Sequence, residues 1–433
     1  MTSITPPAPT APPTPPTPPT PPTHSAALPF VLVCVLLDVV GFGLIIPVLP
    51  ALVGEFTQSS QSQALWYGVS IAAYGFAQFF AAPLLGALSD RYGRRPVLLL
   101  SQLGWGLDFL LIAFAPNLWV IVLARLIGGV TGAGFTVASA YVADVTSAEK
   151  RTQGMGMIGA MFGVGFIVGP AIGGFLGEYG VRVPFYCAAF VALVNVAYGY
   201  FILPESLPAD KRTLYSRSEL LKKSNPFTAL AVLLRLPRGK QGVDVGRLVL
   251  AVAVMNLAQF MMHATFVLYT TQRFAWSPQQ NGMGLFVAGI AHALVQGVLL
   301  GVLVKKFGEK RLALGALVIG ALEFVLFGLA SQGWMIYAAI ALTFIGGASG
   351  PALMGLLSNN VNEAEQGAVM GASTGIAAAM MVAAPLIATP ILAATNHFAT
   401  TDWRFGTVFF VAAALQLGSV CLVWRAVQRR VIT

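Results

Sequence analysis

Four ionisable side chains stand inside long apolar stretches of the sequence: Asp38, Asp108, Arg125 and Glu323. An ionised group at the middle of a bilayer costs at least about 2.5–3.5 kcal/mol, which pairing or contact with a water-filled path reduces. A carboxylate that water reaches from alternating sides can load a proton on one side and release it on the other. The pattern predicts proton coupling by these four residues, with Asp38 or a substrate oxygen as the partner of Arg125. A hydrogen bond that only holds helices together is the alternative for the three acids.

A second set of polar side chains lies further along, in apolar stretches that hold two of the four histidines. Three of its members fall at i, i+3 and i+7, which places them on one face of a helix. A histidine can relay protons near neutral pH, although a lone polar side chain on a helix is more often a packing residue. The candidate substrate-binding residues are Asn256, Gln259, His263, His292 and Gln296.

The composition excludes a soluble protein. Of the 433 residues, 57% are hydrophobic and 9% are charged, whereas soluble domains carry about 25% charged residues. The three cysteines have neither a metal-ligand spacing nor a disulfide framework, so no metal site or cofactor is expected. No phosphate-binding fingerprint is present. The net charge of +9 is explained by membrane topology, as described next, and indicates no nucleic-acid partner.

Twelve stretches have the length of about 20 mostly apolar residues that a membrane-spanning helix needs. The sequence therefore predicts an all-α membrane protein with twelve transmembrane helices in two pseudo-symmetric six-helix bundles. The expected domains are a tail at 1–27, an N-terminal half at 28–203, a cytoplasmic linker at 204–246, a C-terminal half at 247–425 and a tail at 426–433. The expected helices are 29–53, 65–87, 97–115, 118–142, 154–177, 184–203, 247–270, 280–303, 311–330, 334–357, 367–393 and 403–424.

Most of the 25 lysine and arginine residues fall in every second loop and in the linker. Cytoplasmic loops of membrane proteins carry this excess, so both termini are predicted to be cytoplasmic. Arg182, Arg273 and Arg404 are the basic residues expected on the other side. Residues 1–27 are rich in proline, which favours a disordered cytoplasmic tail or a simple spacer.

An internal repeat links the two halves. Residues 86–95 match residues 301–310 at an offset of 215, and the same offset carries Asp108 onto Glu323. Coincidence in a short basic loop is the alternative. Repeats of this kind place a substrate site between the halves near the membrane midplane. In the first copy, Asp90 is predicted to accept hydrogen bonds from a helix N-terminus of the other half and so to hold one state closed. The gating residues are Gly86, Asp90, Arg91, Gly93, Arg94 and Arg95.

These motifs resemble those of a known family. Residues 86–95 resemble the loop signature of the major facilitator superfamily, and residues 165–174 resemble the glycine-proline signature of its drug/proton antiporters. Arg125-Leu-Ile-Gly-Gly resembles the intramembrane arginine motif of the same group, and residues 37–50 look most like those of tetracycline exporters. Glycines every four residues let a neighbouring helix approach closely, and the proline is expected to kink the helix. The antiporter motif comprises Gly165, Gly169, Pro170, Gly173 and Gly174.

The resemblance implies a monomeric, proton-coupled antiporter that exports a tetracycline-like drug by alternating access, with magnesium entering only as part of a chelated substrate. The sequence departs from that subgroup at Gly320, where the exporters carry a carboxylate; here the acid is Glu323, nearly one turn later. His263 stands where Gln is common. A transporter of another amphipathic drug or of a metabolite is therefore the alternative. An enzyme is not expected, because no helix pairs two histidines or a histidine and an acid at i, i+4. A channel is disfavoured because the acids form no ring.

Overall fold

The computed structural model describes residues 27–132, 134–147, 149–213, 219, 225, 227 and 243–428. These residues form helices joined by short turns and loops, and no strand occurs among them. The predictions for the tail at 1–27 and for most of the linker concern residues outside the described ranges.

The helices before the linker are here called the N-terminal group. They are α1 (Ala27–Ile45), α2 (Leu49–Gly54), α3 (Ser60–Tyr92), α4 (Arg94–Ala113), α5 (Leu118–Gly132), α6 (Gly134–Val145), α7 (Arg151–Gly177) and α8 (Val183–Ile202), followed by the short η2 (Ala209–Lys211).

The helices after the linker form the C-terminal group. They are α11 (Val245–Phe274), α12 (Pro278–Leu294), η5 (Val295–Leu299), α13 (Leu300–Leu329), α14 (Gly333–Ile340), α15 (Thr343–Gly346), α16 (Ser349–Asn359), α17 (Glu363–Thr395), η6 (Trp403–Gly406) and α18 (Thr407–Val427).

Eleven helical stretches of the described chain are long and apolar enough to cross a membrane. One of them, at 278–329, is 52 residues long, about twice what one crossing needs. Gly308 divides it, with φ +73° and ψ 155°. Counting it as two crossings gives the twelve predicted, so the all-α membrane fold is confirmed.

Among the described residues, two of the expected single helices are divided. The first ends at Ile45 and resumes at Leu49, because Pro47 between them has no N–H to donate and its ring crowds the preceding turn. The tenth consists of α14, α15 and α16, with a second break at Gly347. The loop expected at 304–310 is absent, because α13 runs through these residues and turns at Gly308.

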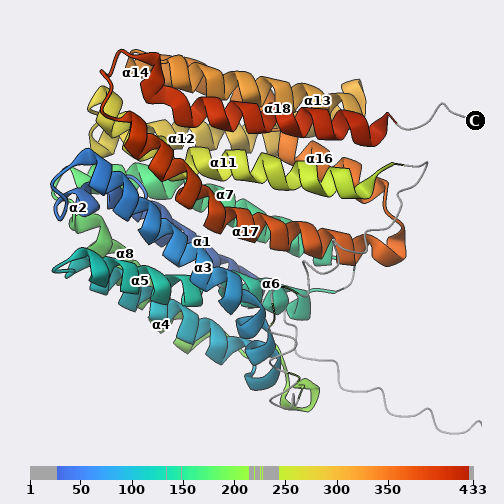
Figure 1. The fold of residues 1–433 in the computed structure, drawn as a ribbon. Coiled ribbons are helices and arrows are strands. Elements are labelled where there is room, and N and C mark those ends of the chain that lie inside the picture. The colour runs from blue at the N-terminus through green and yellow to red at the C-terminus, as the bar shows by residue number, and fades with distance from the viewer. Residues whose placement is uncertain are drawn as a thin grey trace, which may run out of the picture.

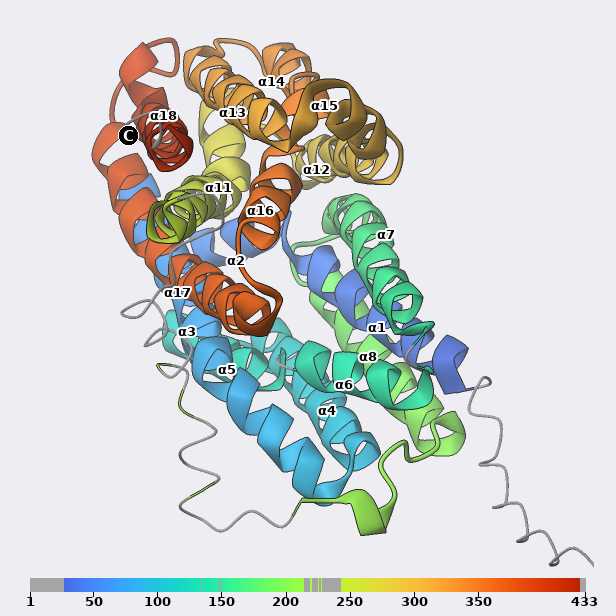
Figure 2. The ribbon, with the colours of Figure 1, turned by 90° about the vertical axis from the view of Figure 1, so that its right-hand side faces the viewer.

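Figure 1 shows the two groups as neighbouring bundles, with helices of both groups running roughly parallel along the long axis of the molecule. Figure 2 looks along that axis and shows α17 beside α3 and α7 beside α12, which are the pairs that join the two groups. Inside the N-terminal group α1 packs on α7 and α8, and α4 packs on α5 and α8. These contacts bring residues that lie far apart in the sequence to one depth.

The loops gather at two ends. At the linker end, on the right in Figure 1, Arg94 contacts Asp144, and the Asp244 N–H donates to the Ala426 carbonyl at 3.2 Å. At the opposite end, here called the contact end, Arg182 pairs with Glu55 at 3.0 Å.

Large apolar side chains remain exposed along the helices, including Phe201, Trp119 and Trp334 with 82, 69 and 65% of their surface accessible. A protein in water covers such residues, whereas lipid accepts them, and aromatic rings gather where the bilayer meets water. The outer surface therefore fits a bilayer.

Candidate functional site

Asp108 and Arg125 form an ion pair in the interior of the N-terminal group. A terminal nitrogen of Arg125 in α5 donates to Asp108 Oδ2 in α4, and both side chains are almost wholly buried. The rings of Tyr74 and Phe109 lie 5.6 and 6.0 Å from the guanidinium carbon. Gly128 leaves room for the pair, since a Cβ at that position would collide with the Asp108 carboxylate.

Asp38 in α1 is held by an amide. Nδ2 of Asn195 in α8 donates to Asp38 Oδ1 at 2.9 Å and to the Cys34 carbonyl oxygen at 3.0 Å. Asn195 is fully buried. The prediction that Arg125 pairs with Asp38 is therefore wrong: α4 packs directly on α5 and gives the arginine another acid, Asp108.

Glu323 in α13 contacts the broken tenth span. The Thr343 hydroxyl in α15 donates to Glu323 Oε1 at 2.7 Å. Gly320, where the family resemblance implies an acid, has a different neighbour, because a Cβ there would lie 2.9 Å from Nε2 of Gln416 in α18. The three-residue displacement thus moves the acid from a position against α18 to one against α15.

His292 lies in the last turn of α12, in the eighth span. Its Nε2 lies 2.6 Å from Nε2 of Gln296, inside the π-helical turn Val295–Leu299 that follows directly. Such turns are frequent at functional sites. A Cβ at Gly347 would lie 3.2 Å from His292 Nδ1 and 2.8 Å from the Thr343 carbonyl. The histidine therefore borders the same broken segment that holds the acid of α13.

The three candidates on α11 differ in their surroundings. Asn256 donates back to the Val252 carbonyl of its own helix at 2.8 Å. Gln259 is half-buried, and His263 is exposed and close enough to His292 to interact with it electrostatically. The structure therefore brings His263 toward the cluster around the eighth span and leaves Asn256 occupied by its own backbone.

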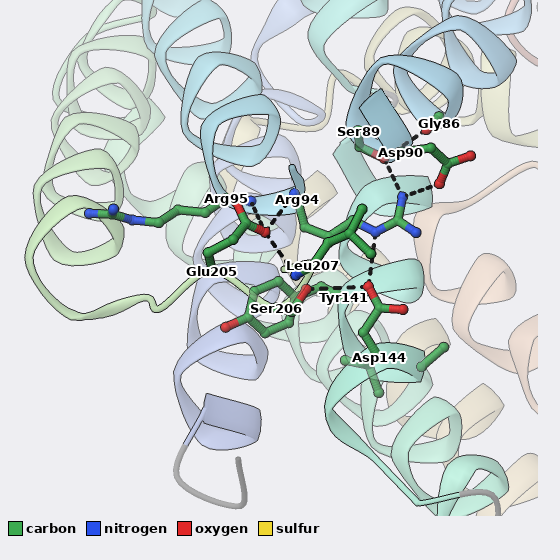
Figure 3. Close-up of polar contacts among 12 residues, drawn as sticks. Gly86, Ser89, Asp90, Arg94, Arg95, Tyr141, Asp144, Glu205, Ser206 and Leu207 are labelled. Atoms are coloured by element: carbon green, nitrogen blue, oxygen red, sulfur yellow. Dashed lines mark hydrogen bonds and ion pairs between the residues drawn. The ribbon is translucent and has the colours of Figure 1, made fainter. Parts of the chain in front are cut away.

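The gating motif forms a network at the linker end (Figure 3). The Arg94 guanidinium donates to Asp90 Oδ1 at 2.5 Å, to Ser89 Oγ at 2.6 Å and to Asp144 Oδ2 at 3.0 Å. Gly93 supplies the turn between α3 and α4 with φ +105°, a conformation that residues with a Cβ rarely adopt.

Glu205 closes the network from the start of the linker. Its Oε1 accepts from the backbone N–H of Arg94 at 2.8 Å and of Leu207 at 3.1 Å, so a carboxylate lies at the N-terminus of α4, where the helix dipole favours it. Beside it the Tyr141 hydroxyl donates to the Pro204 carbonyl at 2.8 Å.

The remaining gating residues lie around this network. Arg95 donates to the Tyr200 carbonyl at 2.5 Å, the guanidinium of Arg91 lies over the neighbouring tyrosine ring, and the Gly86 carbonyl accepts from a serine hydroxyl. The contact between Asp90 and a helix of the other half stays a prediction.

The antiporter motif in α7 has two faces. One packs on α1, where a Cβ at Gly169 would lie 2.7 Å from the Gly43 Cα. Gly165 and Gly173 contact α1 equally closely. The other face meets the C-terminal group, where a Cβ at Gly174 would lie 3.0 Å from the Gly282 Cα of α12, and the neighbouring Pro170 carbonyl borders the same residue.

The two groups meet closely toward the contact end. Glu178, which follows α7, accepts from the Gln279 backbone N–H at 3.1 Å. Hydrogen bonds from the Ser277 hydroxyl and from that N–H lower the pKa of Glu178 below its ordinary value. Gln272 of α11 contacts Gln63 of α3 at 3.3 Å.

Toward the linker end the same helices lack such contacts. At Gly156, Gly159 and Gly163 in α7, and at Gly367 and Gly371 in α17, an added Cβ would meet no atom within 4 Å among the described residues. Toward the contact end α7 therefore packs on α12, and α3 packs on α17, where a Cβ at Gly68 would collide with Thr389. Toward the linker end α3 and α17 diverge (Figure 1).

Sequence reasoning missed several polar side chains that complete these clusters. Asn195 and Gln102 are single amides in apolar stretches, and they would have been found had every polar residue of each predicted span been examined. Thr343 carried no signal, because threonine commonly bonds to its own helix. Asp144 and Glu205 were missed because each borders a loop, where acids are ordinary.

Twelve apolar crossings, an ion pair and further acids in their interior, and two groups of helices joined toward one end define a multi-pass membrane transporter. The chain belongs to the Major Facilitator Superfamily, whose model matches residues 31–385 and, in a second match, 248–431. It is therefore a transporter of small molecules and not an enzyme.

Among curated relatives, the class C tetracycline resistance protein of Escherichia coli is 39% identical over 92% of this chain and 95% of its own length. The class G protein of Vibrio anguillarum is 38% identical over 89% of this chain and 93% of its own length. The solved human organic anion transporter MFSD10 covers 93% of this chain and 100% of its own, with 25% identity and a TM-score of 0.66.

Proposed function

We propose that this protein is a proton-coupled antiporter that exports a tetracycline-like antibiotic by alternating access. The observation that carries the proposal is the presence of acids inside the apolar interior of a chain that resembles tetracycline resistance proteins over about nine tenths of its length. Carboxylates that are shielded from water yet reachable from one side can exchange protons with that side.

The proposed orientation follows from the basic loops, which put the linker end and both termini in the cytoplasm of a bacterial inner membrane. Helices α3 and α17 diverge toward that end, so the structure corresponds to a state that is open to the cytoplasm. Drug enters from the cytoplasm, the two six-helix halves rock about their shared axis, and the contact end opens to release it.

In this proposal the two halves have different roles. Asp38 and the Asp108–Arg125 pair take up and release protons in the N-terminal half. Glu323, His292 and its neighbours line the drug's path in the C-terminal half. The Glu323 carboxylate offers the oxygen ligands that magnesium prefers, which suits a substrate that travels as a divalent-metal chelate with magnesium as part of the cargo. The protein acts as a monomer.

The test is drug accumulation in a bacterium that lacks its own efflux pumps. Cells that express the wild type are expected to accumulate little tetracycline, and a protonophore or Asp38→Asn is expected to restore high accumulation. High tetracycline accumulation in cells that express the wild type, with the protein present in the membrane, would contradict the tetracycline assignment.

The displaced acid at Glu323 motivates a second candidate, export of a different amphipathic drug. The subgroup's acid position is filled from α18 here, so the drug path differs in shape. A panel of unlabelled compounds that compete with labelled tetracycline for binding to the purified protein distinguishes the two. Failure of tetracycline itself to compete would favour the second candidate.

A further inference from the structure

Asp38 lies between two buried amides that come from different helices. Asn195 of α8 donates to its carboxylate and to the backbone one turn earlier, at Cys34. Gln102 of α4 lies near the same carboxylate and near the Cys34 thiol, close enough to interact with both. Asn195 has no accessible surface and Gln102 has 3%. Neither amide can exchange these partners for bulk water.

Each amide also has an unused acceptor. Oδ1 of Asn195 and Oε1 of Gln102 are buried and have no hydrogen-bond partner in the structure. A buried polar atom without a partner costs about 1–3 kcal/mol, so two of them beside one carboxylate call for an explanation. The donor of Asn195 is used, while the acceptors of both amides have no partner.

The two protonation states of a carboxyl group make opposite demands. The ionised form only accepts hydrogen bonds, whereas the neutral form carries one O–H that must be accepted. An amide can meet both demands, because rotating its terminal group exchanges NH2 for C=O. A lysine or arginine satisfies only the ionised form, and an apolar residue satisfies neither.

We propose that Asn195 and Gln102 form a two-amide clamp that positions Asp38 and stabilises it in both protonation states. In the ionised state their NH2 groups donate to the carboxylate, as the NH2 of Asn195 does in the structure. When the carboxylate takes up a proton from water, the new O–H donates to one of the two idle amide oxygens. This inference deepens the proposed function and rests on it for the role of the proton.

Other groups that face Asp38 are few. Cys34 lies one turn away on the same helix, and Tyr74 of α3 interacts electrostatically with Asp38 and with the Asp108–Arg125 pair. From α7 the close neighbours of α1 are glycines, Pro170 and Phe166, which carry no charge. No full charge from α7 or α8 opposes the clamp among the described residues, so the amides are its principal polar partners.

The C-terminal half has no counterpart. At the repeat offset of 215, Asp38, Gln102 and Asn195 correspond to Ala253, Leu317 and Phe410, all apolar. The clamp is therefore present in the N-terminal half only and is not shared by the two copies of the repeat. It also supplies a matched control, Gln416, which is a fully buried amide of the C-terminal half with both polar atoms unpaired.

The first test is infrared difference spectroscopy on the purified protein between acid and alkaline pH, which needs no substrate. The C=O band of protonated Asp38 is identified by its loss in Asp38→Asn. The combined Gln102→Met and Asn195→Leu variant is expected to shift this band to higher frequency, because the O–H has lost its acceptor. Gln416→Leu is expected to leave it in place. An unshifted band in the combined variant overturns the proposal.

The second test compares two modes of transport in membrane vesicles. Uphill tetracycline uptake needs a proton at each cycle, whereas exchange of labelled for unlabelled drug needs no net proton movement. Gln102→Met and Asn195→Leu are each expected to lower uphill uptake about tenfold or more and exchange less than about threefold. If uphill uptake and exchange fall together, or if neither falls, Gln102 and Asn195 do not act as positioning residues for Asp38.

Failure of the proposed function and failure of the two-amide clamp give different experimental results. Wild-type vesicles that move no tetracycline, or move it without protons, contradict the proposed function and leave the infrared result to decide on the clamp. If Asn195→Leu does not accumulate in the membrane, Gln102→Met alone tests the same acceptor, with Gln416→Leu as its control.

Discussion

The interiors of the two halves differ although the repeat relates them. In the N-terminal half the acids are fixed, Asp108 by Arg125 and Asp38 by Asn195, in surroundings closed by rings and glycines. In the C-terminal half the corresponding acid, Glu323, is bonded by one hydroxyl.

The helices that surround these acids also differ between the two halves. The N-terminal half is built on α7 packed closely against α1 through glycines, whereas positions 380, 384 and 388 of the repeat carry larger side chains. The C-terminal half instead contains a tenth span in three pieces and a π-helical turn. Fixed acids suit a proton that must bind at one place, and a broken, polar wall suits a drug of variable shape. The two halves of a repeat can therefore share one arrangement of helices while the residues in their interiors serve different roles.

The largest expected effect follows from breaking the ion pair in the N-terminal half. Arg125→Leu leaves Asp108 buried without its partner, which costs about 3–5 kcal/mol of stability. Thermal unfolding of the purified protein and its abundance in the membrane measure this loss. Replacing both residues by leucine is expected to recover most of the stability. A double variant as unstable as the single one would show that the pair is not what stabilises this interior.

Close glycine packing is the second feature that separates the halves. Gly169→Ala places a methyl group against the Gly43 backbone and is expected to cost about 1–3 kcal/mol, since overpacking forces helices apart. Gly163→Ala in the same helix meets open space and serves as the matched control. Equal unfolding temperatures for the two variants would contradict the tight contact of α7 with α1.

The hydroxyl that holds Glu323 provides the third test. Thr343→Val keeps the shape of the side chain and removes the donor, so uphill tetracycline uptake is expected to fall about fivefold to tenfold. Thr343→Ser retains the donor and is expected to retain most of the activity. Uptake that survives in the valine variant and not in the serine variant would mean that the methyl group, not the hydroxyl, matters.

The smallest expected effect concerns the contact end, where the two halves meet. The pKa of Glu178 is lowered by hydrogen bonds from Ser277 and Gln279, so its ionised form favours the closed contact. This contribution is present above the ordinary carboxyl pKa and is lost as pH falls through the lowered one. Spin labels at Gln61→Cys and Ser331→Cys are expected to move slightly apart between about pH 7 and about pH 3. Glu178→Gln is expected to abolish this pH dependence, and a response that persists in this variant would assign it to another group.

Much of the fold could be predicted because length and hydropathy alone define a membrane crossing. The number of crossings and the repeat between 86–95 and 301–310 came from these signals, and the structure shows positive φ at both Gly93 and Gly308. The break in the first span was missed although Pro47 marks it. The breaks in the tenth span could not be read from hydropathy, which is insensitive to a lost backbone hydrogen bond.

The site was only partly predictable because acids are conspicuous in apolar helices and their partners are not. Asp38, Asp108 and Arg125 stood out by charge, yet the pairing of Arg125 depended on which helices touch. That information lies in the packing of α4 on α5. Amides such as Asn195 and hydroxyls such as Thr343 cost less to bury than a charge, so they leave a weaker signal in the sequence.

The central claim is that drug and protons move in opposite directions and that the N-terminal acids carry the protons. The most direct measurement follows labelled tetracycline and internal pH together in liposomes that contain purified wild-type protein or Asp38→Asn. In the wild type, drug and protons are expected to move in opposite directions. In the variant, drug is expected to move only down its own gradient, without proton movement. Proton movement coupled to drug in Asp38→Asn, or drug transport without protons in the wild type, would contradict it.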